Sequence, residues 1–281
     1  MRRLAIPLLA LALAGCGGAQ GPADEPAEPA DRFDSAAAWK LLREQVDMGP
    51  RPAGSETSRR LAERLRGLLP GGRFQAVPGG LRNVIGRVPG RGDGFVVLGA
   101  HYDTKDEPGF VGANDGASGT AVAVQLAREI RPRTLRRTVV FALFDGEESP
   151  RGTPDSQFAE RGLRGSRVAA PGLSDARAMI LLDFVGDRDL SIPREGLSDA
   201  GLWRRLRDAA SAAGAVEAFP PGVAGGVQDD HLPFLEEGVP SIDLIDFTFP
   251  CWHRRCDDLS AVSERSLDQT GETVIRLLAS L

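Results

Sequence analysis

Two short runs, Thr138 to Phe144 and Ala178 to Leu182, most strongly limit the folds open to this chain. Both are apolar at nearly every position, whereas a strand with one solvated face alternates apolar and polar residues. Strands of this kind are covered on both faces, which is typical of a parallel sheet flanked by helices. The sequence therefore predicts a single α/β domain with a mixed, mostly parallel central sheet and helices on both faces.

The other predicted elements alternate between strands and helices. Residue preferences and turn signals predict strands at 83–88, 95–100 and 241–247. Apolar spacing and capping residues predict helices at 35–46, 55–69, 115–130, 199–213, 229–236 and 263–278. We expect Ser55 to cap the second of these helices, and either Asp115 or Ser118 to open the third.

The first residues of the chain have the composition of an export signal. Met1-Arg2-Arg3 is basic, and the apolar run that follows ends at Ala14, too short to span a membrane as a permanent helix. Leu13-Ala14-Gly15-Cys16 resembles a bacterial lipobox, which implies removal of residues 1–15 and a lipid on Cys16. The alternative is an ordinary secretory peptide. We therefore expect an exported protein, lipid-anchored to the cell envelope on its periplasmic or outer surface.

Residues 16–34 are rich in Gly, Ala, Pro and Glu, and this composition predicts a flexible tether. Residues 35–281 are long enough to form one catalytic domain with a sizeable core, which we expect to be monomeric. The formal net charge of −5 argues against a nucleic-acid partner. The arginines are scattered along the sequence rather than clustered, and this spacing indicates no basic binding patch.

Histidine is rare in this chain, and each histidine has an aspartate within four residues. The three are His101, His231 and His253. Zinc is commonly bound by imidazole and carboxylate groups, with one position left open where the site is catalytic. The pattern therefore predicts a metal site.

Most of the candidate residues follow predicted strands. His101, the pair Glu147-Glu148, Asp183 and His253 each come after a different strand. In open α/β sheets, ligands bind beyond the carboxyl ends of the strands. Four separate segments that obey this rule predict a shared site at one edge of the sheet.

Each of these residues also has a structural interpretation. His101 could be a hydrogen-bonded core histidine, Asp115 a helix cap, and the glutamate pair a solvated turn. Adjacent carboxylates can instead divide their roles, because one can coordinate a metal while the other, at a raised pKa, transfers protons. The glycines near Asp115 favour a functional role there, since they allow the backbone to approach a ligand closely.

Three other residues are expected to support the site. Asp103 lies two positions after His101 and is expected to accept a hydrogen bond from its far ring nitrogen, which would fix the tautomer. Asp229 and His231 either cap the short helix that follows or point inward. Trp252 either belongs to the core or lines a pocket beside His253.

The two remaining cysteines, Cys251 and Cys256, flank Trp252 and His253. Outside the cytoplasm such a pair is expected to form a disulfide, which would close a small loop and hold His253 in place. Two free thiols or a thiolate metal ligand are the alternatives.

Taken together, these motifs resemble the zinc peptidases of metallopeptidase family 28 and, within that superfamily, the glutaminyl-peptide cyclotransferases. The matching segments, which cover most of the chain from Asn83 onward, are Gly99-Ala-His101-Tyr-Asp103, Gly112-Ala-Asn-Asp115-Gly, Phe144-Asp-Gly-Glu147-Glu148, Leu182-Asp183, Gln228-Asp229-Asp230-His231 and Trp252-His253. The ordered set is far more specific than any one segment.

The resemblance implies roles for individual residues. It implies Asp115, Glu148 and His253 as zinc ligands, with Glu147 as the general base and acid. A second zinc, where present, would take His101 and Asp183, with Asp115 as the bridge. Either one zinc or two is compatible with this ligand set.

The branch within the superfamily depends on fewer residues. Gln228-Asp229-Asp230-His231 and Trp252 resemble the cyclases, in which Asp183 and Asp229 would form an acidic network with Glu147. The sequence departs from the cyclases at two places that concern the substrate pocket. No aromatic residue follows the glutamate pair before Phe158, and Arg254 stands after His253 where a small hydroxyl residue is common.

Three functions remain open from the sequence. The first is a zinc-dependent glutaminyl-peptide cyclotransferase, which would bind a peptide or protein N-terminus, with Trp252 and Gln228 in contact with the substrate. The second is a zinc aminopeptidase that hydrolyses N-terminal residues from peptides. The third is a lipoprotein that binds peptides without turning them over.

Overall fold

The structure is a computed structural model that describes residues 32–281 of the chain. Its centre is a six-stranded sheet in the order β1-β2-β4-β3-β5-β6. The strands are β1 (Arg73–Val77), β2 (Leu81–Val88), β3 (Phe95–His101), β4 (Thr138–Phe144), β5 (Met179–Asp183) and β6 (Ser241–Ile245). Neighbours from β4 through β3 and β5 to β6 are parallel, while β2 is antiparallel to both β1 and β4. The predicted mixed, mostly parallel sheet is confirmed.

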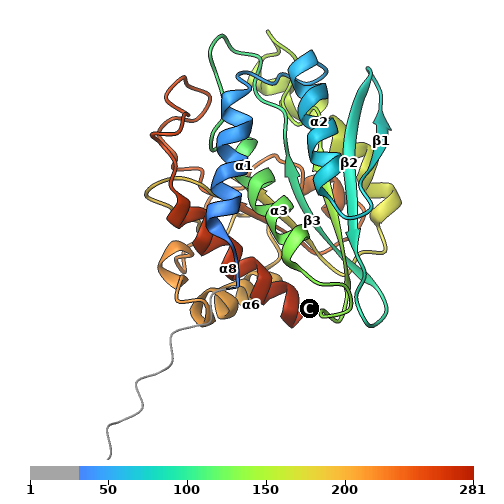
Figure 1. The fold of residues 1–281 in the computed structure, drawn as a ribbon. Helices are drawn as coiled ribbons and strands as arrows, with labels where there is room; N and C mark the ends of the chain where they lie inside the picture. Colours follow the sequence, from blue (N-terminus) through green and yellow to red (C-terminus); the bar gives the residue numbers. More distant parts are fainter. Residues whose placement is uncertain (1–31) are drawn as a thin grey trace, which may run out of the picture. The chain divides into compact units, whose positions relative to one another are not determined.

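Helices cover both faces of this sheet, as predicted. Figure 1 shows the longer helices gathered over one face, namely α1 (Ser35–Asp47), α2 (Glu56–Leu68), α3 (Ala117–Glu129), α6 (Ala200–Ala212) and α8 (Glu264–Ser280). The short α5 (Arg164–Ala169), η2 (Ala170–Leu173) and α7 (Leu232–Glu236) pack on the other face. The remaining described helices are η1 (Asp155–Gln157), α4 (Phe158–Arg161) and η3 (Val216–Ala218).

The continuous apolar run in β4 has a direct packing explanation. Its residues alternate between two hydrophobic cores: Val139 and Phe141 belong to the larger core, while Val140 and Ala142 belong to the smaller one. All seven residues of the strand are buried. Because side chains on successive strand residues point to opposite faces, a sheet covered on both sides has no solvated position for a polar side chain.

The capping prediction holds for α2 and fails for α3. The Ser55 side chain accepts a hydrogen bond from the Ser58 N–H, as expected. Neither Asp115 nor Ser118 opens α3, because Gly116 occupies the cap position with φ of 88° and no side chain caps the helix. A Cβ on Gly116 would lie 2.6 Å from the backbone oxygen of Asp103, so this turn requires glycine.

Several predicted boundaries are wrong. The folded part begins before Ser35, because Phe33 is buried against the core and Asp34 caps α1. The last strand ends at Ile245 rather than at residue 247, and α7 begins at Leu232 rather than at residue 229.

The prediction also misses the edge strand β1, which pairs only with β2 and has several exposed positions. The signal peptide, Cys16 and the tether up to residue 31 lie outside the described residues. Within residues 32–281, no helix is both long and apolar enough to cross a membrane.

Candidate active site

The candidate residues meet at the edge of the sheet where the parallel strands end. His101 and Asp183 are the last residues of β3 and β5 rather than the first residues after them. Glu147 and Glu148 lie in the loop after β4. The loops that precede α3 and follow β6 add Asp115 and His253, so five segments contribute to one site.

Asp115, Glu148 and His253, here called the ligand cluster, converge on one point. His253 Nε2 lies 3.2 Å from Glu148 Oε1 and 3.6 Å from Asp115 Oδ2, and one ligand atom from each residue lies within 4.8 Å of the others. Both of these carboxylate oxygens are buried and have no hydrogen-bond donor. Such a donor set, with buried oxygens lacking partners, fits a cation.

A second grouping shares Asp115. His101 Nε2 lies 3.3 Å from Asp115 Oδ1 and 3.3 Å from Asp183 Oδ1. Asp115 therefore turns one carboxylate oxygen toward each histidine. This arrangement is compatible with either one or two metal ions, as the sequence predicts.

The loop that carries His253 is held by a disulfide. Cys251 and Cys256 are bonded, with their Cα atoms 5.4 Å apart. His253 has a left-handed backbone with φ of 52°, which is uncommon for a residue other than glycine. Its ring stacks on Trp252 at 4.4 Å between centroids and meets Phe110 edge-on at 6.2 Å. The disulfide and the ring packing together hold the imidazole of His253 so that it points toward the carboxylates.

Asp257, which sequence reasoning missed, ties this loop to the loop of Asp115. Its carboxylate accepts hydrogen bonds from the Asn114 N–H at 2.7 Å and the Asp115 N–H at 3.0 Å. Burial, together with the charge of Asp115, raises the pKa of Asp257 to about 7. The only signal in the sequence was its place directly after Cys256.

Arg51 is a second supporting residue that sequence reasoning missed. It is fully buried, and its guanidinium donates hydrogen bonds to the backbone oxygens of Val111 and Gly112, just before Asp115. Burial lowers the pKa of Arg51 to about 10, and the nearby charges of Asp257 and Asp115 oppose that shift. This buried cation offsets part of the negative charge behind the site.

Asp103 supports the glutamate pair rather than His101. Its carboxylate accepts hydrogen bonds from the N–H groups of Gly146, Glu147 and Glu148, at 2.9, 3.2 and 3.2 Å. His101 Nδ1 lies 3.8 Å away, which is too far for a hydrogen bond. The expected tautomer-fixing contact is therefore absent, and the three backbone donors explain why the carboxylate turns toward the other loop.

The two adjacent glutamates have opposite electrostatic environments. Burial and the charge of Glu148 raise the pKa of Glu147 well above its usual value. Burial also opposes the charge of Glu148, but the nearby imidazole of His253, helped by Lys105, lowers the pKa of Glu148 below its usual value. Neighbouring carboxyl groups whose pKa values are driven apart are suited to different roles, one holding a proton and one staying ionised.

A second buried group, here called the acidic cluster, adjoins the pocket, and two of its members line it: Asp229, Asp243, Glu195 and His231. His231 Nε2 is 3.4 Å from Glu195 Oε2, and its Nδ1 is 3.7 Å from Asp243 Oδ2. His231 occupies the N-cap position of α7, but its side chain forms no cap hydrogen bond and does not belong to the ligand cluster. Burial and the charge of Asp183 raise the pKa of Asp229 well above its usual value. Burial and the charge of Asp229 do the same to the pKa of Asp243.

Sequence reasoning missed two members of the acidic cluster. Asp243 lies in the buried strand β6, so a lone acid within an apolar run was its available signal. Glu195 carried no such signal, because it lies in a polar stretch far from every motif.

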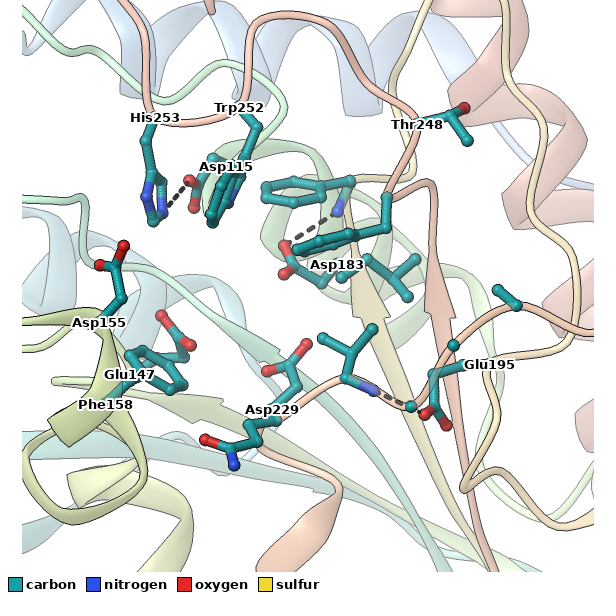
Figure 2. Close-up of a pocket in the computed structure, with 18 of the residues that line it drawn as sticks. Asp115, Glu147, Asp155, Phe158, Asp183, Glu195, Asp229, Thr248, Trp252 and His253 are labelled. Atoms are coloured by element: carbon teal, nitrogen blue, oxygen red, sulfur yellow. Dashed lines mark hydrogen bonds and ion pairs between the residues drawn. The ribbon is translucent and has the colours of Figure 1, made fainter.

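A pocket of about 540 Å³ opens in front of these groups (Figure 2). In the figure, Asp115 lies beside His253 and Trp252, while Glu147 lies beside Phe158 on another side of the pocket. Asp183 and Asp229 also line it. Gln228 also lines the pocket, as do the aromatic side chains Phe158, Phe184 and Phe247. Phe158 thus supplies an aromatic wall although it follows the glutamate pair at a distance in sequence.

Comparisons with known proteins agree with this geometry. A family model described as peptidase family M28 matches residues 83–278. The glutaminyl-peptide cyclotransferase of Bos taurus is 30% identical over 237 residues, which cover 67% of this chain and 61% of that protein. The Drosophila melanogaster glutaminyl-peptide cyclotransferase is 26% identical, over 70% of this chain and 64% of that protein. The chain thus spans less than two thirds of the length of either relative.

Two solved structures superpose on this chain along nearly their whole length. A glutaminyl cyclase of Porphyromonas gingivalis superposes with a TM-score of 0.79 at 30% identity, covering 89% of this chain and 99% of that one. A leucine aminopeptidase precursor from Bacteroides thetaiotaomicron gives a TM-score of 0.79 at 26% identity, covering 89% and 98%. The resemblance that the motifs predict is confirmed, and because the family model matches well over half of the sequence, the chain belongs to peptidase family M28.

Proposed function

We propose that this protein is a zinc-dependent glutaminyl-peptide cyclotransferase, which converts an N-terminal Gln to pyroglutamate and releases ammonia. One observation carries the choice of reaction: Asp229 lies buried in the pocket wall, close enough to Asp183 for that charge to raise its pKa. A carboxyl group that keeps its proton can donate a hydrogen bond to a carboxamide and share protons with Glu147. The same group leaves less room for the nucleophilic water of a peptidase.

The ligand cluster is suited to zinc. Two carboxylates and one imidazole are zinc donors, and they leave a position free for substrate. When bound there, zinc would supply Lewis acidity toward the γ-carboxamide oxygen of the substrate. The pair His101 and Asp183 would hold a second ion, with Asp115 shared, where two are bound.

The proton transfers would then be carried out by a side chain of the protein. The α-amine of the substrate attacks its γ-carboxamide carbon, a C–N bond closes the five-membered ring, and the C–NH2 bond breaks. Glu147 takes a proton from the amine and delivers one to the departing ammonia. Because the attack is intramolecular, much of the entropic cost of bringing the two groups together is already met.

The pocket walls position the substrate. Trp252 and Gln228 line the entrance from different loops, and Phe158 faces them from η1 and α4. We propose that the Trp252 ring packs on the Gln side chain while the Gln228 amide binds the peptide backbone. Carboxylates in the wall favour a cationic N-terminus over an acidic one.

An aminopeptidase is the second candidate, and the pairing of His101 and Asp183 around Asp115 favours it, since two adjacent metal ions can clamp a hydrolytic water. Zinc-loaded protein should be incubated with Gln-Ala and Leu-Ala and the products identified by mass spectrometry. Loss of ammonia from Gln-Ala with intact Leu-Ala supports the cyclase. Gain of water with cleavage of both peptides supports the aminopeptidase, and zinc binding without either product supports a peptide-binding protein.

We also propose that the chain acts as an exported monomer whose Cys16 carries a lipid. The lipobox-like segment before Cys16 supports this. Labelling of cells with a fatty-acid analogue should mark the wild-type protein and leave Cys16→Ser unmarked. Equal labelling of both proteins would contradict the anchor.

A further inference from the structure

Arginines that are scattered in the sequence meet at the end of the sheet opposite the pocket. The backbone N–H of Gly92 donates to Arg136 O at 2.8 Å, which joins the β2–β3 loop to the α3–β4 loop. The Arg177 N–H donates to Phe95 O at 2.9 Å, which adds the turn before β5. These three segments carry six arginines, here called the arginine end: Arg91, Arg131, Arg133, Arg136, Arg137 and Arg177. Arginines that are scattered along the sequence are therefore brought onto adjacent segments by the fold.

The charges of the arginine end are available to a partner. Five of the six arginines are exposed, and Arg137 is half-buried. Where these side chains have hydrogen-bond partners, the acceptors are main-chain oxygens: Arg91 donates to Thr134 O, and Arg137 donates to Asp93 O and to an oxygen of the last residue, Leu281. Within residues 32–281, none of the six forms an ion pair with an Asp or Glu side chain. The exposed acids in the same segments are Asp93 and Asp175, so positive charge predominates.

The opposite end of the sheet carries the opposite charge. Seven carboxyl side chains line the pocket, against Lys105 and His253, although a raised pKa reduces the charge of Glu147 and Asp229. The whole chain has a formal net charge of −5, so the positive surface is a local departure from an acidic molecule. An anionic surface orients a protein with this charge distribution electrostatically. The arginine end faces the surface, and the pocket faces away from it.

The N-terminal segment enters the folded domain at the arginine end. The Asp34 N–H donates to Glu129 Oε1 at 2.7 Å, and Glu129 lies two residues before Arg131. Only residues 17–31 separate Cys16 from the first described residue, and an extended chain of that length reaches at most about 50 Å. A lipid on Cys16 would thus tether the domain from the same end that carries the arginines.

We propose that the arginine end docks on anionic phospholipid headgroups and holds the pocket open toward the aqueous side. Guanidinium groups pair well with phosphate oxygens, and each arginine near an anionic membrane surface contributes about a fivefold gain in affinity. The occupant is a membrane rather than a nucleic acid, because the chain as a whole is acidic and the tether enters beside the patch. The proposal rests on the proposed lipid anchor for its orientation, and it does not depend on the reaction catalysed.

The test uses residues 16–281 with Cys16→Ser, so that neither a lipid nor the apolar run before Cys16 contributes to binding. Sedimentation with vesicles is measured for phosphatidylcholine alone and for phosphatidylcholine mixed with phosphatidylglycerol. We expect binding only to the mixed vesicles, present at about 0.01 M salt and lost at about 1 M, where the screening length falls from about 30 Å to about 3 Å. Arg133→Glu with Arg136→Glu should lower the affinity by about 25-fold or more.

The matched control is Arg59→Glu with Arg60→Glu, which makes the same charge change at exposed positions of α2. This control should bind like the parent chain. The milder Arg133→Gln with Arg136→Gln, checked for unchanged thermal unfolding, covers the event that charge reversal disturbs folding. Equal losses in both charge-reversed proteins, or binding to phosphatidylcholine alone, would overturn the proposal.

One further outcome would also overturn it. If vesicle binding survives in the Arg133 and Arg136 variants but is lost when the exposed Trp252 and Phe247 are replaced by Ser, the pocket rim faces the membrane instead. Turnover of Gln-Ala in solution, measured on the same variants, keeps the two proposals separate. A protein that docks without releasing ammonia would refute the cyclase and leave the docking surface standing.

Discussion

The ligand cluster and the acidic cluster both combine a histidine with carboxylates, yet they differ in what they can bind. In the ligand cluster, His253 and the oxygens of Asp115 and Glu148 point at one site beside the pocket. In the acidic cluster, His231 lies between Glu195 and Asp243, and neither candidate metal grouping within residues 32–281 includes it. Composition alone thus does not separate a cation site from a buried cluster in which the pKa values of two aspartates, Asp229 and Asp243, are raised.

The difference follows from exposure and from the direction of the donors. The His253 side chain is 22% exposed, and a ligand can reach it from the pocket, whereas His231 is fully buried. In the acidic cluster, burial and the charges of neighbouring carboxylates, Asp183 among them, raise the pKa of Asp229 and Asp243, so those groups reduce their charge by keeping protons. The charges of Glu148 in the ligand cluster and Asp229 in the acidic cluster both raise the pKa of Glu147. Glu147 therefore lies where a proton can pass between the two clusters.

The largest expected effect tests this intermediate position. Glu147→Gln should lower kcat for Gln-Ala by about 10²- to 10⁴-fold, because the amide can neither take nor deliver the proton. Zinc content should stay at the wild-type value, since Glu148 and not Glu147 belongs to the ligand cluster. Steady-state kinetics and metal analysis on one preparation provide the check. A variant that loses zinc and activity together would show that Glu147 acts through the metal site.

The next prediction compares the two histidines. Zinc at about 1,000 times its Kd should stabilise the wild-type fold by about 4 kcal/mol. His253→Ala should lose most of this gain, because one of three donors is gone. His231→Ala should keep the gain although its metal-free form unfolds more easily, since a fully buried side chain is removed. Urea unfolding with and without zinc measures both, and the reverse ranking would refute the assignment.

A pH dependence of stability should distinguish the acidic cluster. Burial opposes the charge of Glu195, but the hydrogen bonds from His231 and from backbone N–H groups lower the pKa of Glu195 to about 2. A depressed pKa gives stability that is present above the unfolded value, about 4.3, and is lost as the pH falls toward 2. Glu195→Gln should therefore be less stable than wild type by on the order of 2–3 kcal/mol at pH 7.

This gap between wild type and Glu195→Gln should shrink as the pH falls toward and through 2, because Glu195 gains its proton there while the Gln side chain is neutral throughout. Unfolding free energies from denaturant titration at several pH values measure it. Glu217→Gln, at an exposed position outside both clusters, is the control and should show no such convergence. A constant gap across this range would mean that shape, rather than charge, explains the loss.

The smallest effect concerns how the ligand cluster is held. Cys251→Ala with Cys256→Ala should weaken zinc binding by about 10- to 100-fold, the usual cost of losing support behind a metal ligand. The loop would no longer hold the left-handed backbone of His253, so the metal would have to order it on binding. Competition with a chromophoric chelator gives the affinity. The acidic cluster should keep its pH response, and unchanged zinc affinity would remove the disulfide from this role.

Local pattern predicted the positions that depend on strand direction. His101, Glu147, Glu148 and Asp183 sit at the ends of parallel strands, and those ends must share an edge of the sheet. The supporting contacts could not be predicted in this way. The Asp103 carboxylate accepts hydrogen bonds from three backbone N–H groups of the loop after β4. This contact depends on where the ends of β3 and β4 lie relative to each other, which is a feature of the tertiary structure.

The sequence by itself determined the sheet, its covered faces and the set of donors gathered at its edge, because alternation and apolar runs act over a few residues at a time. Only the tertiary structure decided that Asp257 and Arg51 brace the loop of Asp115, and that His231 stays with Glu195 and Asp243 instead of joining a metal site. The physical reason is the distance along the chain over which each kind of interaction acts. Burial, charge and hydrogen-bond geometry depend on which distant segments meet, and no local pattern in the chain records that meeting.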